Sequence, residues 1–193
     1  DERIDFSDIV SRRQVGESLE AVVVREGKAI PVTISLKAAF DLVSGPTYDV
    51  KPSYLIVGGL VFMPLSDDLI AARGADYRVR SLSADGVPTP ERTKVVVLSH
   101  VLAHDFNRGY HNWSMAPVTR VNGRPIGNLA DLVAAFKVPV EGRHEIEFNH
   151  YSGYGENKGA RIVLDAAEAD KAMPEIMLRY GVPYDRSEDL KPR

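Results

Sequence analysis

The chain has 193 residues, a length that suits one large domain or one small domain with a fragment of another. Apolar residues make up 44% and charged residues 26%, which is typical of a protein that buries a core. The 24 basic and 27 acidic residues give a net charge of -3 and are interspersed, so the basic patch of a nucleic-acid-binding protein is excluded. Cysteine is absent, which excludes disulfides and cysteine-ligated metals.

The first third of the chain predicts a small unit and a linker. Asp5 to Val15 has the spacing of a short helix, and two runs rich in Val and Ile, Ser18 to Arg25 and Ala29 to Leu36, predict a hairpin. A unit of residues 1–36 is too small to bury a core of its own. Residues 37–52 contain glycine and prolines and predict a linker.

The middle of the chain predicts two strands separated by a helix and a loop. Tyr54 to Pro64 predicts a strand with a bulge or a close backbone approach at its Gly-Gly pair, and Ser66 predicts the N-cap of a helix that ends near Arg73. Ala75 to Thr93 has no clear periodicity and predicts an exposed loop. Lys94 to Leu102 predicts a strongly apolar strand.

The last third alternates short strands with two helices. In chain order the predicted elements are strands at 117–121 and 125–126 around an Asn-Gly turn, a helix at 129–136, strands at 144–150 and 161–164, and a helix at 166–180. The helix at 129–136 has its apolar residues on one face, and the order helix, strand, turn, strand repeats that of residues 5–36. The last ten residues are charged and predict a frayed tail.

The order of these elements, together with three short motifs, resembles a PDZ domain of the HtrA/Deg serine protease family. The motifs are Gly59-Leu60-Val61-Phe62-Met63-Pro64-Leu65, the apolar strand from Val95 to Leu102, and the turn Val121-Asn122-Gly123-Arg124-Pro125-Ile126 followed by the helix at Leu129 to Phe136. The start at Pro52-Ser53-Tyr54 and the end at Arg179-Tyr180-Gly181-Val182-Pro183 are similar to the second PDZ domain of plant-type Deg proteins.

The resemblance implies an α+β, mostly β fold: a partly open PDZ-like barrel with two or three helices, preceded by a partial PDZ unit. The expected division is a remnant of a first PDZ domain at 1–36, a linker at 37–52, a PDZ-like domain at 53–183 and a frayed tail at 184–193. A PDZ cleft lies between a strand edge and a helix, and an extended peptide adds to that edge.

On this resemblance we expect the peptide-binding cleft between the strand near Lys94 and the helix near Leu129, although each apolar residue taken singly also fits core packing. The expected cleft residues are Lys94, Val95, Val96, Val97, Leu98, Ser99, Leu129, Leu132, Val133 and Phe136. The 75–93 insertion replaces the short loop that receives a terminal carboxylate, so Arg92 or Lys94 takes that role or the insertion closes the cleft.

The resemblance implies a non-catalytic regulatory or oligomerisation region of an HtrA/Deg-like serine endopeptidase in protein quality control. A free-standing PDZ adaptor without a protease domain is the alternative, and the sequence preceding Asp1 separates the two. The implied partners are extended peptides, unfolded protein or a neighbouring subunit of a homo-oligomer, with no cofactor, no nucleic acid and no membrane span. The expected localisation is periplasmic or otherwise exported, with the cytoplasm left open.

The chain offers no convincing catalytic or metal site. Ser152 lacks the preceding glycine of a Gly-x-Ser-Gly-Gly loop and sits in a predicted hairpin turn. His100 and His104 are four residues apart, which in a strand spans roughly 13 Å and is too far for one metal ion. The glycines at 153, 155 and 159 lack the helix that follows a phosphate loop. Trp113 is interpreted as a core or interface aromatic.

Overall fold

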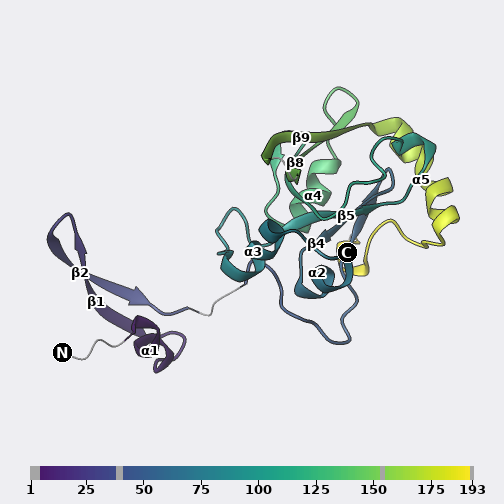
Figure 1. The fold of residues 1–193 in the computed structure, drawn as a ribbon. Helices are drawn as coiled ribbons and strands as arrows, with labels where there is room; N and C mark the ends of the chain where they lie inside the picture. The colour runs from purple at the N-terminus through teal and green to yellow at the C-terminus, as the bar shows by residue number, and fades with distance from the viewer. Residues whose placement is uncertain (1–4, 38–40, 153–154, 192–193) are drawn as a thin grey trace. The chain divides into compact units, whose positions relative to one another are not determined.

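The computed structural model describes residues 5–37, 41–152 and 155–191 and divides the chain into two units, residues 1–40 and 41–193. The first unit contains helix α1 (Phe6–Ser11) and the antiparallel hairpin of β1 (Ser18–Arg25) and β2 (Lys28–Ser35) (Figure 1). Leu19 is the one buried residue among those described in this unit, while Val22 and Val24 are 67% and 75% exposed. The unit therefore has almost no core of its own.

The second unit is built on one antiparallel sheet. Its strands are β3 (Leu55–Val57), β4 (Leu60–Pro64), β5 (Val96–Val101), β6 (Ala116–Val121), β7 (Arg124–Pro125), β8 (Arg143–Ser152) and β9 (Gly155–Asp165). They pair in the order β3-β4-β5-β6-β8-β9, with β7 beside β6. In the described residues the two end strands, β3 and β9, do not pair with each other, so the sheet is not a closed barrel.

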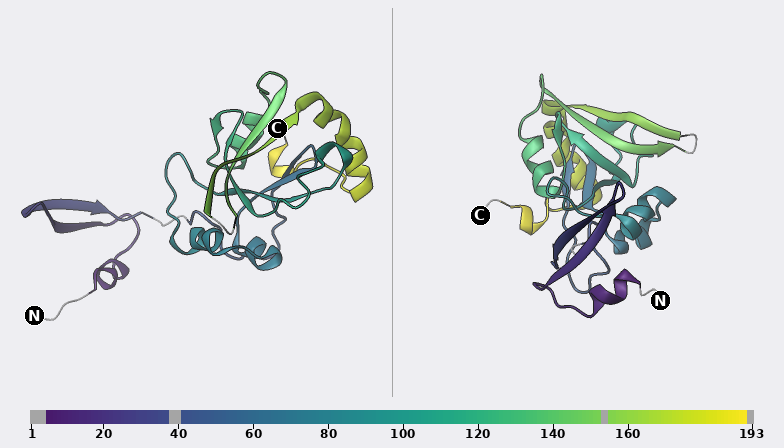
Figure 2. Two further views of the ribbon diagram at one scale, coloured as in Figure 1. Left: turned by 45° about the horizontal axis from the view of Figure 1, so that its top comes forward. Right: turned by 90° about the vertical axis from the view of Figure 1, so that its left-hand side faces the viewer.

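Helices cover both sides of this sheet (Figures 1 and 2). They are α2 (Asp67–Arg73), α3 (Tyr77–Asp85), α4 (Leu129–Phe136) and α5 (Ala166–Tyr180), with single turns at Asp105–Asn107 (η1) and Glu188–Leu190 (η2). Each α-helix of this unit begins at a side chain that accepts a backbone N–H: Ser66, Asp76, Asn128 and Asp165. The α+β class with antiparallel sheets and a few helices is confirmed.

The alternation of β5 divides the core between two layers. Val96 and Leu98 pack on the side of α4 with Leu132, and Val95 and Val97 pack on the opposite side with α2 and α3. Because both faces of β5 are covered, the strand reads as a continuous apolar run. A third cluster, which includes Ile176, holds α5 against the sheet.

Three segments that were expected to be irregular are packed. The 75–93 insertion contains α3, whose Val79 is 3% exposed, although its other residues are largely polar and give little periodicity. The expected linker contains Leu42 and Val43, both 4% exposed in the second unit. In the expected frayed tail, Ser187 Oγ accepts a hydrogen bond from Tyr54 N and Asp189 Oδ2 accepts one from Ser53 Oγ, so this segment is held at the start of the domain.

Candidate functional site

Strand β5 lies inside the sheet, where no peptide can add. Leu98 pairs with Phe62 of β4 on one side and with Ala116 of β6 on the other, and Val97 is likewise paired on both sides. The backbone groups on both edges are therefore occupied in this stretch. The pairing of β5 with both β4 and β6 contradicts the expectation of a free strand edge at residues 94–99.

The side chains of the same segment are also engaged elsewhere. Val95, Val96, Val97 and Leu98 are at most 1% exposed, so they belong to the core and line no cleft. Ser99 is buried with its Oγ 3.0 Å from His100 Nδ1. Lys94 Nζ donates to the Asp41 carbonyl at 3.0 Å and to Ser44 Oγ at 2.9 Å, so its charge is not directed at a ligand carboxylate.

The strand that approaches helix α4 is β4. Phe62 of β4 and Phe136 of α4 have ring centroids 5.5 Å apart. The outer edge of β4 is already paired with β3 through a two-residue turn at Gly58 and Gly59, whose φ values of 55° and 85° suit a tight hairpin. The chain's own strand therefore occupies the position beside β4.

The Gly58–Gly59 turn is closed by a buried asparagine. Asn107 Nδ2 donates to the carbonyls of Gly58 and Leu102 at 2.9 Å each, and its Oδ1 accepts from His104 N at 2.9 Å. A β-carbon on Gly59 would lie 2.5 Å from Asn107 Nδ2. The Gly58 carbonyl and the α-carbon of Gly59 are thus packed against Asn107 of η1.

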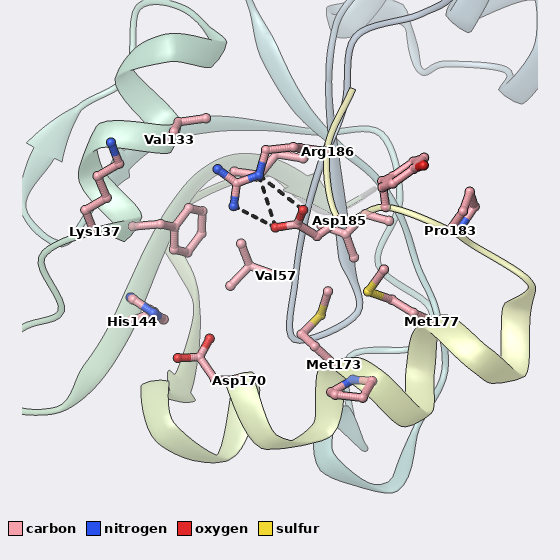
Figure 3. Close-up of a pocket in the computed structure, with 15 residues that line it drawn as sticks. Val57, Val133, Lys137, His144, Asp170, Met173, Met177, Pro183, Asp185 and Arg186 are labelled. Atoms are coloured by element: carbon pink, nitrogen blue, oxygen red, sulfur yellow. Dashed lines mark hydrogen bonds and ion pairs between the residues drawn. The ribbon is translucent and has the colours of Figure 1, made fainter. Parts of the chain in front are cut away.

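A groove of about 480 Å³ lies between α4, β3, α5 and the chain after α5 (Figure 3). Of the expected cleft residues, Val133 and Phe136 line it, whereas Leu129 and Leu132 are buried in the core. No described residue of the 75–93 insertion lines it. The walls that the sequence did not indicate are Leu55, Ile56, Val57, Met173, Pro174, Met177, Pro183, Tyr184, Asp185 and Arg186.

Two pairs of polar side chains, together with Lys137, interrupt the apolar walls of the groove. Arg186 and Asp185 form an ion pair at 2.6 Å, and the hydrogen bond to Asp185 raises the pKa of Arg186. At the other end His144 lies near Asp170 (Figure 3). Burial lowers the pKa of His144, and the Asp170 carboxylate opposes that shift.

The imidazole of His144 is oriented by Asn122. Asn122 Nδ2 lies 3.2 Å from His144 Nδ1 and also donates to the carbonyls of Ala135 and Val138, while Asn122 Oδ1 accepts from Glu145 N. The two hydrogens of this amide are directed at the two carbonyls, at 2.9 and 3.0 Å, and the His144 ring packs beside the amide. The groove thus contains an imidazole whose position is fixed by Asn122.

The remaining sequence candidates do not form a site among the residues that the structure describes. Ser152 ends β8, and its side chain lies outside the described atoms. His104 Nε2 is 3.3 Å from Glu175 Oε1, and no group of three metal-ligating side chains is found in the described part of the chain. Trp113 packs on Phe148 with ring centroids 5.1 Å apart. In the same residues no helix is both long and apolar enough to span a bilayer.

Comparison with known proteins agrees with the arrangement of strands and helices. Residues 43–189 match the family model of a PDZ domain. The chain is 33% identical over 193 residues to "Putative protease Do-like 3, mitochondrial" and 31% identical over 192 residues to "Protease Do-like 2, chloroplastic", both of Arabidopsis thaliana. These alignments cover 100% and 98% of this chain but 32% and 30% of the relatives. The chain therefore spans about a third of their length.

The match includes the Gly58–Gly59 turn, α4 and the chain after α5, and it leaves out the whole first unit. The chain belongs to the PDZ domain family and is related to the plant Deg/HtrA protease-like proteins.

Proposed function

We propose that this chain is the non-catalytic regulatory region of a Deg/HtrA-like serine endopeptidase of protein quality control, and that it recognises an extended polypeptide segment. The observation that carries the proposal is the apolar groove between α4 and β3 in a chain of the PDZ family. The relationship to proteins named as Do-like proteases supports the protease connection. The gene sequence upstream of Asp1 tests the protease connection. A His, an Asp and a Gly-x-Ser-Gly-Gly motif encoded there would support it, and a gene without them would contradict it.

The groove suits apolar side chains of varied shape. Met173 and Met177 line its α5 wall, and their flexible thioether side chains adapt to different partners. Apolar walls with a few oriented polar groups are typical of sites that bind a defined segment. A volume of about 480 Å³ holds only a few side chains of such a segment, so recognition would be modest in affinity.

Binding can be tested with Met177→Glu and its neighbour Leu178→Glu as the matched control. Met177 lines the groove, whereas Leu178 is 84% exposed on the same helix and does not line it. The probe is reduced, carboxymethylated α-lactalbumin, a permanently unfolded polypeptide. We expect Met177→Glu to weaken binding about tenfold, because a charge replaces a half-buried thioether in the groove wall, and Leu178→Glu to leave it unchanged.

A purely structural role is the second candidate, and the pairing of β3 on the edge of β4 favours it. In that case the domain would hold subunits or neighbouring domains together without receiving a peptide. The amide NMR signals of Ile56, Val57 and Val133 distinguish the two roles. If these signals do not shift when the lactalbumin probe is added in excess, peptide recognition is rejected and the structural role remains.

A further inference from the structure

The segment Tyr184–Leu190, here called the strap, runs antiparallel along the outer edge of β3. Ile56 N donates to the Asp185 carbonyl at 2.7 Å, and Ser187 N donates to the Tyr54 carbonyl at 3.0 Å. Between these two bonds Leu55 and Arg186 face each other as a β-bridge. The strap thus behaves as one more strand at this end of the sheet.

Side chains clamp the strap in this register. Ser187 Oγ accepts from Tyr54 N at 3.0 Å, and Ser53 Oγ donates to Asp189 Oδ2 at 2.7 Å. Tyr54 Oη also reaches the Tyr184 carbonyl at 3.3 Å. The clamp is therefore concentrated on two hydroxyl groups, Ser53 and Ser187, and neither of them lines the groove.

The backbone groups that the strap covers are those that an added peptide would use. Tyr54 and Ile56 direct their hydrogen bonds away from β4, and a peptide that extends a sheet pairs with such outward groups. Asp185 and Arg186 of the strap also line the groove (Figure 3). A ligand segment cannot pair with β3 there while the strap is in place.

The strap is attached by main-chain bonds, by the side-chain bonds of Ser53, Tyr54 and Ser187, and by Leu190, which packs against the main core cluster. Only two of the main-chain bonds described above join it to β3, and Tyr184 is 55% exposed. It follows α5, which ends at Gly181 in the left-handed conformation, and Pro183 prevents the helix from continuing. No residue from 184 to 190 is fully buried, and such a segment opens locally at a lower free-energy cost than a core strand.

We infer that the strap is a built-in competitor that an extended internal segment of a client polypeptide displaces from Tyr54 and Ile56. This inference rests on the proposed function and names its regulation. The ligand is an extended internal segment because the strap that it replaces pairs with Tyr54 and Ile56 through main-chain groups and presents no terminal carboxylate there. Displacement frees the edge of β3 and opens the groove along its strap side.

The test uses the full 193-residue chain with the double substitution Ser53→Ala and Ser187→Ala, and Ser114→Ala, an exposed serine outside the strap, as control. Reduced, carboxymethylated α-lactalbumin is the probe. We expect about tenfold tighter binding to the double variant, because the competent open state is populated more often, and faster hydrogen exchange at the Ile56 amide. The control should behave as the wild type.

A second measurement needs no substitution. An acetylated and amidated peptide with the sequence of residues 183–190, added in excess to the wild type, should compete with the lactalbumin probe and shift the Ile56 amide signal. If the probe binds and Met177→Glu weakens it, but the serine variant and the strap peptide change nothing, the strap inference fails and the proposed function stands. If the probe binds no variant, both fail.

Discussion

Asn107 and Asn122 each tie several backbone groups together with one buried side-chain amide. Asn107 holds the Gly58–Gly59 turn, and Asn122 joins the end of α4 to the start of β8 while it orients His144. The Asn-Gly pair at 122–123 predicted a turn from sequence. Its side-chain partners depend on α4 and β8 lying beside it, which no local pattern indicates.

His144 gives the stability of the domain a pH dependence. Burial holds its pKa below the ordinary value, and the same is true of His100, where Arg73 adds to the effect. The unfolded chain therefore takes up more protons as the pH falls below about 6.5, so the contribution is present above that pH and is lost below it. Of the charged side chains that line the groove with His144, the Asp170 carboxylate opposes the lowering of the His144 pKa. Another, Lys137, lies at the C-terminal end of α4.

The measurement is the free energy of urea unfolding at pH 7.5 and at pH 5.0. We expect the wild type to lose stability at the lower pH, and His144→Gln to lose less. His111→Gln, which changes an exposed histidine, should lose as much as the wild type. An equal loss in wild type and His144→Gln would contradict the assignment.

At the scale of elements, local signals predicted most helices and strands but missed α3 and misjudged one turn. Asn128 and the apolar face of 129–136 gave α4 with its observed bounds. The Gly-Gly pair inside 54–64 predicts a bulge or a close backbone approach within one strand, and the close approach is present at Gly59, but the pair forms a hairpin turn between two strands. That choice hid β3, and with it the strand that occupies the edge of β4 and lines the groove.

The turn can be tested by comparing Gly59→Ala with Gly123→Ala. Both glycines have positive φ, so both substitutions introduce backbone strain of about 1 kcal/mol. A β-carbon at Gly59 would also lie 2.7 Å from the Leu102 carbonyl, whereas at Gly123 nothing lies within 4 Å. We expect a loss of about 3 kcal/mol for Gly59→Ala and about 1 kcal/mol for Gly123→Ala in chemical denaturation. Equal losses would mean that the turn is not tightly packed.

At the scale of the whole molecule, the two units differ in how they are stabilised. The second unit has three buried clusters joined by one sheet, while the first is a helix and a two-stranded hairpin with exposed valines. An isolated two-stranded hairpin is marginal in water. Composition predicted that residues 1–36 lack a core, but it did not show that Leu42 and Val43 belong to the second unit.

Removing the first unit should therefore cost the second very little. We expect residues 41–193 to unfold within about 0.5 kcal/mol of the full chain, since the three clusters lie in that part. Circular dichroism during urea unfolding gives the comparison, and the peptide of residues 1–40 measured alone should show no cooperative transition. A large loss of stability in the fragment would show that the first unit supports the second.

The sequence by itself determined the α+β class, the PDZ resemblance, the boundaries of α4 and the apolar character of β5, because these depend on local periodicity, capping and short motifs. Only the tertiary structure decided that β5 is a central strand, that β3 and the strap occupy the outer edge, and that α5 supplies a wall of the groove. A central strand and a buried edge strand are both apolar runs, and their neighbours are fixed by contacts between residues far apart in the chain.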